Sequence, residues 1–178
     1  MLFRSSMSSE LIYDAVVVGG GPAGATAAHT LALKGMKILQ LDKRGRIKPC
    51  GGAIPPRLIK DFQIPDELLV ARAKSARMVS PSGKAVDIPI ENGFVGMVDR
   101  AQFNEWLRER AVTAGAERED GLFESLTREN SNVRIHYRAR GARDSDHGSL
   151  KSVLAKSVIG ADGAKSQVGR SEIGRAHV

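Results

Sequence analysis

Three consecutive glycines, Gly19 to Gly21, constrain the fold of this 178-residue chain more than any other feature. They follow an apolar, β-branched run at 13–18, which predicts a buried parallel strand. The alanine- and leucine-rich segment 23–34 predicts a helix, and Gly35 ends it because glycine tolerates the left-handed conformation. Residues 37–41 predict a second strand, so the chain opens with a strand–helix–strand unit.

The residue types at the turn of this unit are typical of dinucleotide binding. Gly19 permits the tight turn, Gly21 lets a pyrophosphate approach the backbone, and Gly24 lets the helix pack closely on the sheet. The helix N-terminus, around Ala23, offers free N–H groups and a partial positive charge to phosphates. Asp42 ends the second strand roughly 20 residues after the last glycine, where a carboxylate accepts hydrogen bonds from ribose hydroxyls and repels a 2′-phosphate. These five residues are therefore predicted to bind the ADP half of a dinucleotide.

A second motif decides between NAD and FAD. Residues 157–161 predict another short strand, followed by Asp162 and Gly163. The whole stretch 160–170 reads Gly-Ala-Asp-Gly-Ala-x-Ser-x-Val-x-Arg and resembles the second fingerprint of glutathione-reductase-like flavoprotein reductases and hydroxylases. That resemblance implies that Asp162 and Gly163 lie close to the flavin pyrophosphate. Asp-Gly alone is a common turn, but together with the first motif it favours FAD.

Residues 100–114 predict a helix, with Asp99 as its N-cap and Gly115 at its end. Its inward face is predicted from apolar residues at three- and four-residue spacing: Phe103, Trp106, Leu107 and Ala111. The Asp-Arg-x-x-Phe sequence at its start resembles the family helix whose arginine approaches the FAD phosphates. Arg100 is therefore a candidate cofactor ligand, with an ordinary surface arginine as the alternative.

The rest of the chain predicts a loop of small residues and an antiparallel sheet. The Lys-Pro-Cys-Gly-Gly-Ala segment 48–53 would let backbone approach a flat ligand closely. A helix is expected from Pro56 to about Phe62, and 138–149 is expected to be a polar loop. Further strands are expected as a hairpin at 76–80 and 85–90, and as a small sheet at 121–127, 133–138 and 152–155. The predicted fold class is α/β: a glutathione-reductase-like FAD-binding Rossmann domain, incomplete, with a small antiparallel β sheet inserted.

Composition bounds the class of protein. Apolar residues at 42% and charged residues at 26% are typical of a soluble globular chain, and the lone Cys50 fits a reducing cytoplasm. The net charge of +7 comes without a basic run interleaved with aromatics, which disfavours nucleic acid, and the scattered histidines predict no metal site. Segment 15–33 lacks Asp, Glu, Lys and Arg, but its glycines and Pro22 would break a membrane-spanning helix. No signal peptide is evident, and Met7 is an alternative start.

Four segments together, at 14–41, 48–52, 99–116 and 159–170, resemble the geranylgeranyl reductase family, above all its chlorophyll and bacteriochlorophyll branch. The Pro-Cys-Gly-Gly loop is the most specific part. The resemblance implies an NADPH-dependent flavoenzyme that reduces geranylgeranyl to phytyl, on geranylgeranylated (bacterio)chlorophyll or on geranylgeranyl diphosphate. It also places Cys50, Gly51 and Gly52 beside the flavin, with Cys50 as a catalytic candidate or simply a small packing residue. A cytoplasmic protein is expected, with peripheral association at the photosynthetic membrane surface as a further implication.

The family pattern also contains a later glycine–aspartate motif and a substrate domain with an apolar tunnel, which this sequence lacks. Residues 1–171 are therefore interpreted as the N-terminal part of the FAD/NAD(P)-binding domain, and we expect this part alone to hold FAD poorly. Residues 172–178 resemble a translated sequencing adapter and are interpreted as a non-native tail. The alternatives are a flavin-dependent aromatic hydroxylase, which the Cys50 loop disfavours, a nicotinamide-dependent dehydrogenase, and an inactive fragment.

Overall fold

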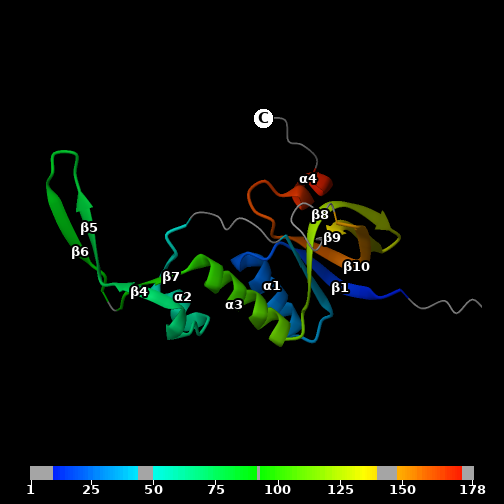
Figure 1. Ribbon diagram of the computed structural model, residues 1–178, viewed down its shortest axis with the longest axis horizontal. Coiled ribbons are helices and arrows are strands. Elements are labelled where there is room, and N and C mark those ends of the chain that lie inside the picture. The colour runs from blue at the N-terminus through cyan, green and yellow to red at the C-terminus, as the bar shows by residue number, and fades with distance from the viewer. Residues whose placement is uncertain (1–9, 44–49, 92, 140–147, 174–178) are drawn as a thin grey trace, which may run out of the picture. The chain divides into compact units, whose positions relative to one another are not determined.

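The computed structural model describes residues 10–43, 50–91, 93–139 and 148–173 (Figure 1). The chain divides into two compact units, each described by itself below. Unit 1 consists of Met1–Gly45 and Leu107–Val178, and unit 2 consists of Arg46–Trp106.

Unit 1 is built on four parallel strands. The strand β1 (Ile12–Val18), the helix α1 (Pro22–Ala32) and the strand β2 (Ile38–Asp42) form the predicted strand–helix–strand unit, which is confirmed. β1 lies between β2 and β10 (Leu150–Gly160), and β2 pairs on its other side with β8 (Glu117–Glu129). The order β8-β2-β1-β10, with a helix between β1 and β2, is the Rossmann arrangement that the sequence predicted.

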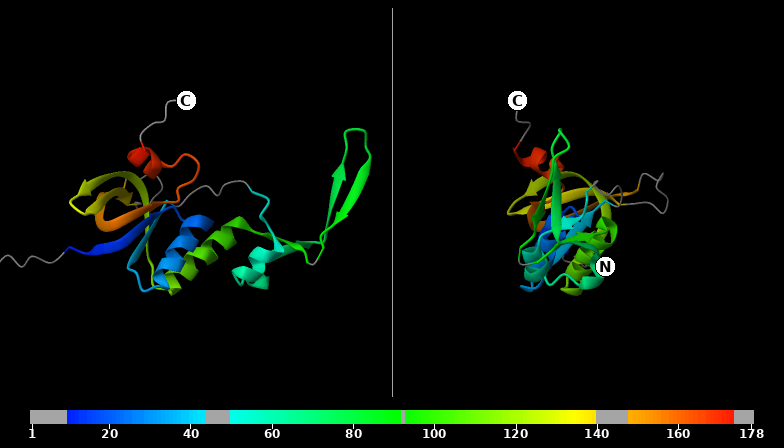
Figure 2. Two further views of the ribbon diagram at one scale, coloured as in Figure 1. Left: turned by 180° about the vertical axis from the view of Figure 1, so that it is seen from behind. Right: turned by 90° about the vertical axis from the view of Figure 1, so that its left-hand side faces the viewer.

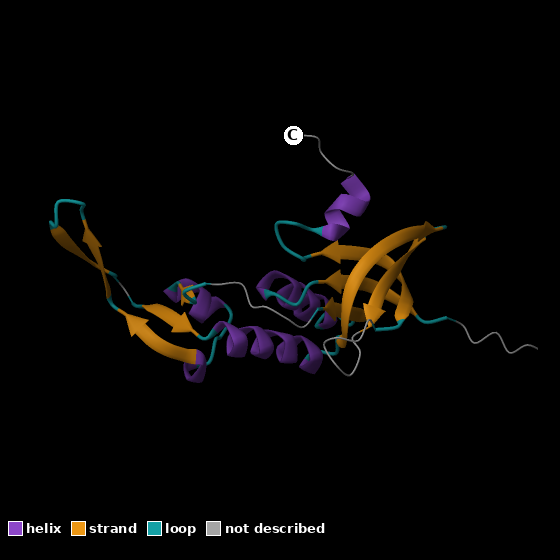
Figure 3. Ribbon diagram, turned by 45° about the horizontal axis from the view of Figure 1, so that its top comes forward, coloured by secondary structure: helices purple, strands orange, loops and turns teal. Residues whose placement is uncertain are grey.

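Two long strands take part in both a parallel and an antiparallel sheet. The first residues of β8 pair with β2, and the rest pair with β9 (Asn132–Ala139). β10 pairs first with β9 and then with β1, so the five strands close into a ring, and Figure 3 shows the curvature of β8. The prediction of separate strands at 152–155 and 157–161 was therefore wrong: no turn residue interrupts the backbone between the two partners. β8 also begins before the predicted residue 121.

Both faces of the parallel sheet are buried, which explains the continuous apolar run of β1. One face packs against α1 and the part of α3 (Arg100–Thr113) from Leu107 onward, through a cluster that includes Val17, Ala28 and Ala111 (Figure 2). The other face packs inside the strand ring, where Val16 and Leu41 join residues of β8, β9 and β10. The parallel sheet therefore separates two apolar clusters, one on each of its faces.

A short helix that the sequence did not predict ends the described part of unit 1. α4 (Gln167–Ile173) contacts β8 and β10, and Val168 packs into the ring core. α4 includes the first two residues of the interpreted tail, and Glu172 forms an ion pair with Arg128. The remainder of that tail lies outside the described residues, so the boundary at Ser171 stays a prediction.

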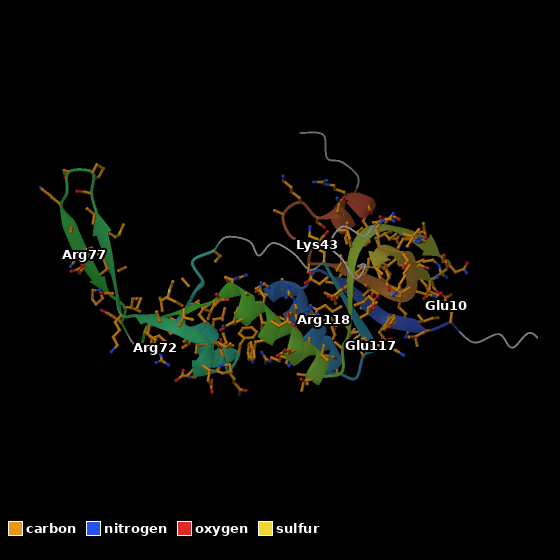
Figure 4. The ribbon with its side chains drawn as sticks, viewed as in Figure 1. Glu10, Lys43, Arg72, Arg77, Glu117 and Arg118 are labelled. Carbon is orange, nitrogen blue, oxygen red and sulfur yellow. The ribbon has the colours of Figure 1, made fainter. Side chains whose placement is uncertain are left out.

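Unit 2 contains a small sheet and a hairpin. The strands β3 (Ala53–Ile54), β7 (Val95–Val98) and β4 (Leu69–Ala73) form a three-stranded sheet, with the helix α2 (Pro56–Asp61) and the 3₁₀ turn η1 (Asp66–Leu68) between them. The predicted helix at Pro56 and the predicted hairpin, β5 (Ser75–Val79) and β6 (Ala85–Pro89), are confirmed. The outward Arg77 in Figure 4 pairs with Asp87 across the hairpin at 2.7 Å.

The N-terminal part of α3 also falls in unit 2, and its predicted cap is confirmed. Asp99 Oδ1 accepts hydrogen bonds from the backbone N–H groups of Ala101 at 2.8 Å and Gln102 at 3.0 Å. Phe103 is buried, and the half-buried Trp106 stacks on it with ring centroids 6.0 Å apart.

The apolar segment 15–33 divides between β1, the glycine turn and α1. Among the described residues, no helix combines the length and the apolar character needed to cross a membrane.

Candidate cofactor site

The glycine turn between β1 and α1 is shaped by its own backbone contacts. Gly19 has a φ of +114°, and a Cβ there would overlap the carbonyl group of Ala161. A Cβ on Gly24 would overlap the carbonyl oxygen of Gly19. Both positions therefore require glycine for the fold: Gly19 because of its positive φ and the nearby carbonyl group, and Gly24 because of the close packing alone. These constraints agree with the roles predicted from the sequence: a tight turn at Gly19, and close packing of the helix at Gly24.

Gly21 differs from these two glycines. A Cβ there would meet no protein atom within 4 Å. Gly21 is also the N-cap residue of α1, with Pro22 in the first turn and no acidic residue in that turn. Ala25 N–H donates to the carbonyl oxygen of Gly21 at 2.9 Å as the first bond of the helix, so the preceding N–H groups of Ala23 and Gly24 have no intrahelical acceptor. Open space in front of such a helix end fits a pyrophosphate.

Asp42 stands at the end of β2 in an ion pair that the sequence did not predict. Arg108, on α3, places Nη2 2.9 Å from Asp42 Oδ2 and donates from Nε to the carbonyl oxygen of Gly20 at 2.9 Å. The Asp42 side chain is 12% exposed and the Arg108 side chain 19% exposed. The site predicted for ribose is thus a mostly enclosed carboxylate with a guanidinium beside it.

The structure brings the two glycine motifs together. β10 ends beside β1, and Ala161 N–H donates to the carbonyl oxygen of Val18 at 2.8 Å. A Cβ on Gly19 would lie 3.0 Å from the backbone nitrogen of Asp162, so the Asp-Gly turn adjoins the glycine turn. This adjacency is what a shared phosphate site requires.

The carboxylate of Asp162 is used by the protein itself. It accepts hydrogen bonds from Ser166 Oγ at 2.5 Å and from the backbone N–H groups of Gln167 at 2.6 Å and Val168 at 3.3 Å, so it caps α4. Burial acts to raise the pKa of Asp162, but these hydrogen bonds outweigh burial and the pKa is lowered. Gly163 follows with a φ of +89°. The structure accounts for the Asp-Gly pair by local geometry, and its contact with a cofactor stays a prediction.

The remaining predicted ligands lie in unit 2. Cys50 is exposed, and Gly51 has no protein atom within 4 Å of a Cβ position. Gly52 has a φ of +71°, its Cβ would overlap the carbonyl oxygen of Val98, and it accepts a hydrogen bond from Val98 N–H at 3.0 Å. Packing on β7 therefore explains Gly52 without a ligand. Lys48 and Pro49 lie outside the described residues.

Arg100 begins α3 and is half-buried. Its Nε is a buried donor with no hydrogen-bond partner in the described structure. A buried unpaired donor costs free energy unless a ligand or water satisfies it, so Arg100 fits the predicted role in binding phosphate.

Arg108 and Gly20 are the site residues that the sequence analysis missed. Arg108 lies eight residues after Arg100, which places both on one side of the same predicted helix. That spacing was the available signal. Its partner Asp42 is remote in sequence, and only the fold reveals the pair.

Comparison with known proteins defines the class. Residues 13–171 match the pyridine nucleotide-disulphide oxidoreductase family, and the chain belongs to this family. The sequence is 58% identical to geranylgeranyl diphosphate reductase of Rhodobacter capsulatus over 161 residues, which is 90% of this chain and 40% of that protein. It is 38% identical to digeranylgeranylglycerophospholipid reductase of Methanosarcina acetivorans, across 89% of this chain and 40% of that protein. The chain thus spans less than half the length of these relatives.

A solved structure agrees with these relatives. The crystal structure of a geranylgeranyl bacteriochlorophyll reductase-like protein from Thermoplasma acidophilum superposes with a TM-score of 0.78 at 30% identity, covering 90% of this chain and 41% of that chain. The predicted fold class and the predicted likeness to geranylgeranyl reductases are confirmed. The family match supports the binding of FAD.

Proposed function

We propose that this chain is the cofactor-binding part of an FAD-dependent, NADPH-using reductase that saturates geranylgeranyl double bonds to phytyl in (bacterio)chlorophyll synthesis. The observation that carries the proposal is the open helix N-terminus at Gly21 with Asp42 at the end of β2, in a chain homologous to geranylgeranyl diphosphate reductase. The activity is proposed for a protein of the relatives' length, since the chain spans 40% of the Rhodobacter protein.

The residues of unit 1 would hold the ADP half of FAD. The N–H groups of Ala23 and Gly24 at the start of α1 face phosphate oxygens, and the missing side chain at Gly21 leaves room for them. The carboxylate of Asp42 would accept hydrogen bonds from the ribose hydroxyls. In unit 2, we assign the unpaired Nε of Arg100 to a phosphate oxygen. When bound, FAD supplies two-electron hydride transfer between a nicotinamide and an alkene.

Reduction of an isolated alkene takes one hydride and one proton. We propose that Cys50, with Gly51 and Gly52, lines the flavin and that its exposed thiol is a candidate proton donor. A thiol is a weak acid at neutral pH, so an ordered water or another acid is the competing donor. Loss of the proton from Cys50 would be followed by its return from solvent.

The proposed substrate is geranylgeranylated (bacterio)chlorophyll or geranylgeranyl diphosphate, and peripheral binding at the photosynthetic membrane would give access to the first of these. The archaeal relative, whose name gives a geranylgeranylated glycerophospholipid, makes a lipid-linked chain the competing substrate. All three share the same alkene chain and differ in the head group. A comparison of the three substrates in one assay therefore separates them.

Mass spectrometry of the product tests the reaction class. A protein of the relatives' length, supplied with FAD, NADPH and each substrate, should add two mass units per turnover. Product that gains oxygen would instead establish the hydroxylase alternative. A purified protein that releases no flavin on denaturation would contradict the proposal and favour a nicotinamide-dependent dehydrogenase.

The chain itself gives a second test. ADP titrated into it should bind, and FAD should bind more weakly than it does to a protein of the relatives' length. Gly21→Asp should abolish ADP binding because a carboxylate would occupy the phosphate position. Gly83→Asp, in the turn of the β5–β6 hairpin, is the matched control, because a Cβ there also meets no protein atom within 4 Å and the residue has no assigned role in binding. Equal binding by wild type and Gly21→Asp would contradict the assignment of the glycine turn.

A further inference from the structure

Resting on the proposed cofactor site, we propose that Arg108 is a positioning residue that fixes Asp42 and Gly20 in the geometry that receives the adenosine ribose. Arg108 belongs to unit 1, as do both of its partners. It would act on the ligand through Asp42 and not by direct contact.

The guanidinium makes two different contacts. Nε donates to the carbonyl oxygen of Gly20 at 2.9 Å, and Nη2 lies 2.9 Å from Asp42 Oδ2. A guanidinium is planar with its donors in a rigid fork, so fixing one edge on the glycine turn fixes the direction in which the carboxylate is held. Arg108 therefore couples the orientation of the Asp42 side chain to the backbone of the turn.

Gly20, the middle glycine of the three, packs against the same ion pair between Arg108 and Asp42. A Cβ on Gly20 would overlap the Asp42 carboxylate and lie 2.7 Å from Arg108 Nε. No such crowding exists at Gly21, where nothing lies within 4 Å. The two adjacent glycines therefore have separate reasons: Gly20 accommodates the ion pair, whereas Gly21 leaves space for a ligand.

Charge and burial make the pair effective. Both side chains are mostly enclosed, with 12% exposure for Asp42 and 19% for Arg108, so solvent screens their attraction less than at an open surface. A carboxylate close to a pyrophosphate site would also repel the incoming phosphates, and the guanidinium offsets that charge. With Oδ2 engaged by Arg108, we assign Oδ1 to a ribose hydroxyl.

Direct binding of a phosphate by Arg108 is the competing role, and a double-mutant cycle separates the two roles. The variants are Arg108→Gln, Asp42→Asn and the double variant, with Arg110→Gln as the control on the same helix. ADP is the probe, measured by calorimetry with the 178-residue chain. FAD, followed by flavin fluorescence, is the second probe.

Each single variant is expected to weaken ADP binding about tenfold, and the double variant is expected to bind no more weakly than Asp42→Asn, since Arg108 acts through Asp42. Arg108→Lys should recover part of the loss because it keeps the charge without the two-pronged geometry. Arg110→Gln should bind as the wild type does. Thermal unfolding of each variant, without ligand, verifies that it is folded, and Arg108→Lys carries the comparison if Arg108→Gln does not fold.

Three outcomes overturn the inference. Losses that multiply in the double variant would make Arg108 a direct ligand, and unchanged ADP affinity in both Arg108 variants would remove any role for it. Either result leaves the proposed cofactor site intact. A wild-type chain that binds neither ADP nor FAD would overturn the cofactor site and the positioning role together.

Discussion

The hydroxyl group of Tyr13 on β1 lies 2.5 Å from Oε2 of Glu117 on β8 and ties together residues 104 positions apart in the sequence. Figure 4 labels Glu117 where β8 begins. Tyr13 as a whole is only 5% exposed. Burial, and then the hydrogen bond and negative charge of Glu117, raise the pKa of Tyr13 well above its ordinary value of 10.0.

Alkaline titration should reveal this environment, because the chain contains only two tyrosines. The pKa of Tyr137 is also raised, by burial and then by the charge of Glu119. Phenolate absorbance of the folded chain should therefore rise at a higher pH than that of the urea-unfolded chain, which titrates near 10. Tyr13→Phe removes one of the two steps and is the control that assigns the other. Phenolate formation near pH 10 in the folded protein would contradict the burial.

The same shift predicts how stability changes with pH. A folded state with raised pKa values keeps protons that the unfolded chain releases, so this contribution to the free energy of unfolding is complete below pH 10. It is lost as the pH rises from 10 through the folded-state values. Urea unfolding at pH 8 and at higher pH measures it, and Tyr13→Phe should flatten the decline. An identical decline in the variant would assign the effect to other groups.

Asp162→Asn is expected to destabilise the chain by about 1 kcal/mol, because the carboxylate caps α4. The lowered pKa of Asp162 fixes the sign of the pH dependence: its contribution is complete above the unfolded-state pKa and is lost as the pH falls through the folded-state pKa. Urea unfolding at pH 7 and pH 3 measures both effects. The control is Asp61→Asn, which removes an exposed ion pair with Arg57 and should change stability by a few tenths of a kcal/mol. A variant as stable as wild type at pH 7 would remove the capping role.

Alanine substitutions should separate the glycines that shape the turn from the one that faces a ligand. Gly19→Ala and Gly24→Ala each place a methyl group against backbone carbonyl atoms. Each should lower the free energy of unfolding by about 1–3 kcal/mol. Gly21→Ala meets no protein atom, so it should leave stability nearly unchanged and weaken ADP binding. Denaturant unfolding and calorimetry measure the two effects. If Gly21→Ala destabilised the chain as much as Gly24→Ala, the space at Gly21 would not be open.

The adjacent glycines of the cysteine loop offer the corresponding comparison in unit 2. Gly52→Ala adds a methyl group against the Val98 carbonyl at a residue with a φ of +71°, whereas Gly51→Ala meets nothing within 4 Å. Loss of stability is therefore expected for Gly52→Ala alone, by about 1–3 kcal/mol. Thermal unfolding followed by circular dichroism compares them. Equal effects would mean that the loop adopts another conformation.

Elements whose formation depends on neighbouring residues in the chain were predicted correctly from the sequence. The β-branched run of β1, the alanine-rich α1 and the Asp99 cap all follow from neighbours in the chain, and each is found. The hairpin was predicted from two strand-like segments joined by turn residues, and Arg77 and Asp87 form a cross-strand pair within it.

What escaped prediction depends on residues far apart. The strands β3 and β7 are short, so their sequences carry little periodic signal, and they become strands through pairing between β3 and β7 and between β7 and β4. β10 could not be recognised as one strand because its two partners, β9 and β1, come from separate parts of the chain. The ion pair of Arg108 with Asp42 likewise forms only because the fold brings α3 beside the end of β2. The sequence analysis assigned Asp162 to the second flavoprotein fingerprint and therefore did not predict that its carboxylate caps α4.

The strand ring also sets the order in which the chain can fold during synthesis. β1 is made first but pairs with β10, and the ion pair of Asp14 with Lys156 spans 142 residues. Unit 1 is therefore completed only after nearly the whole described chain has left the ribosome, whereas unit 2 is one continuous stretch of the sequence. Pairings between such distant segments form slowly, because a long loop must close before they contribute. Until then, the edge of β1 that pairs with β10 has no partner strand, and this nascent stage is the one at which a chaperone would protect the chain from aggregation.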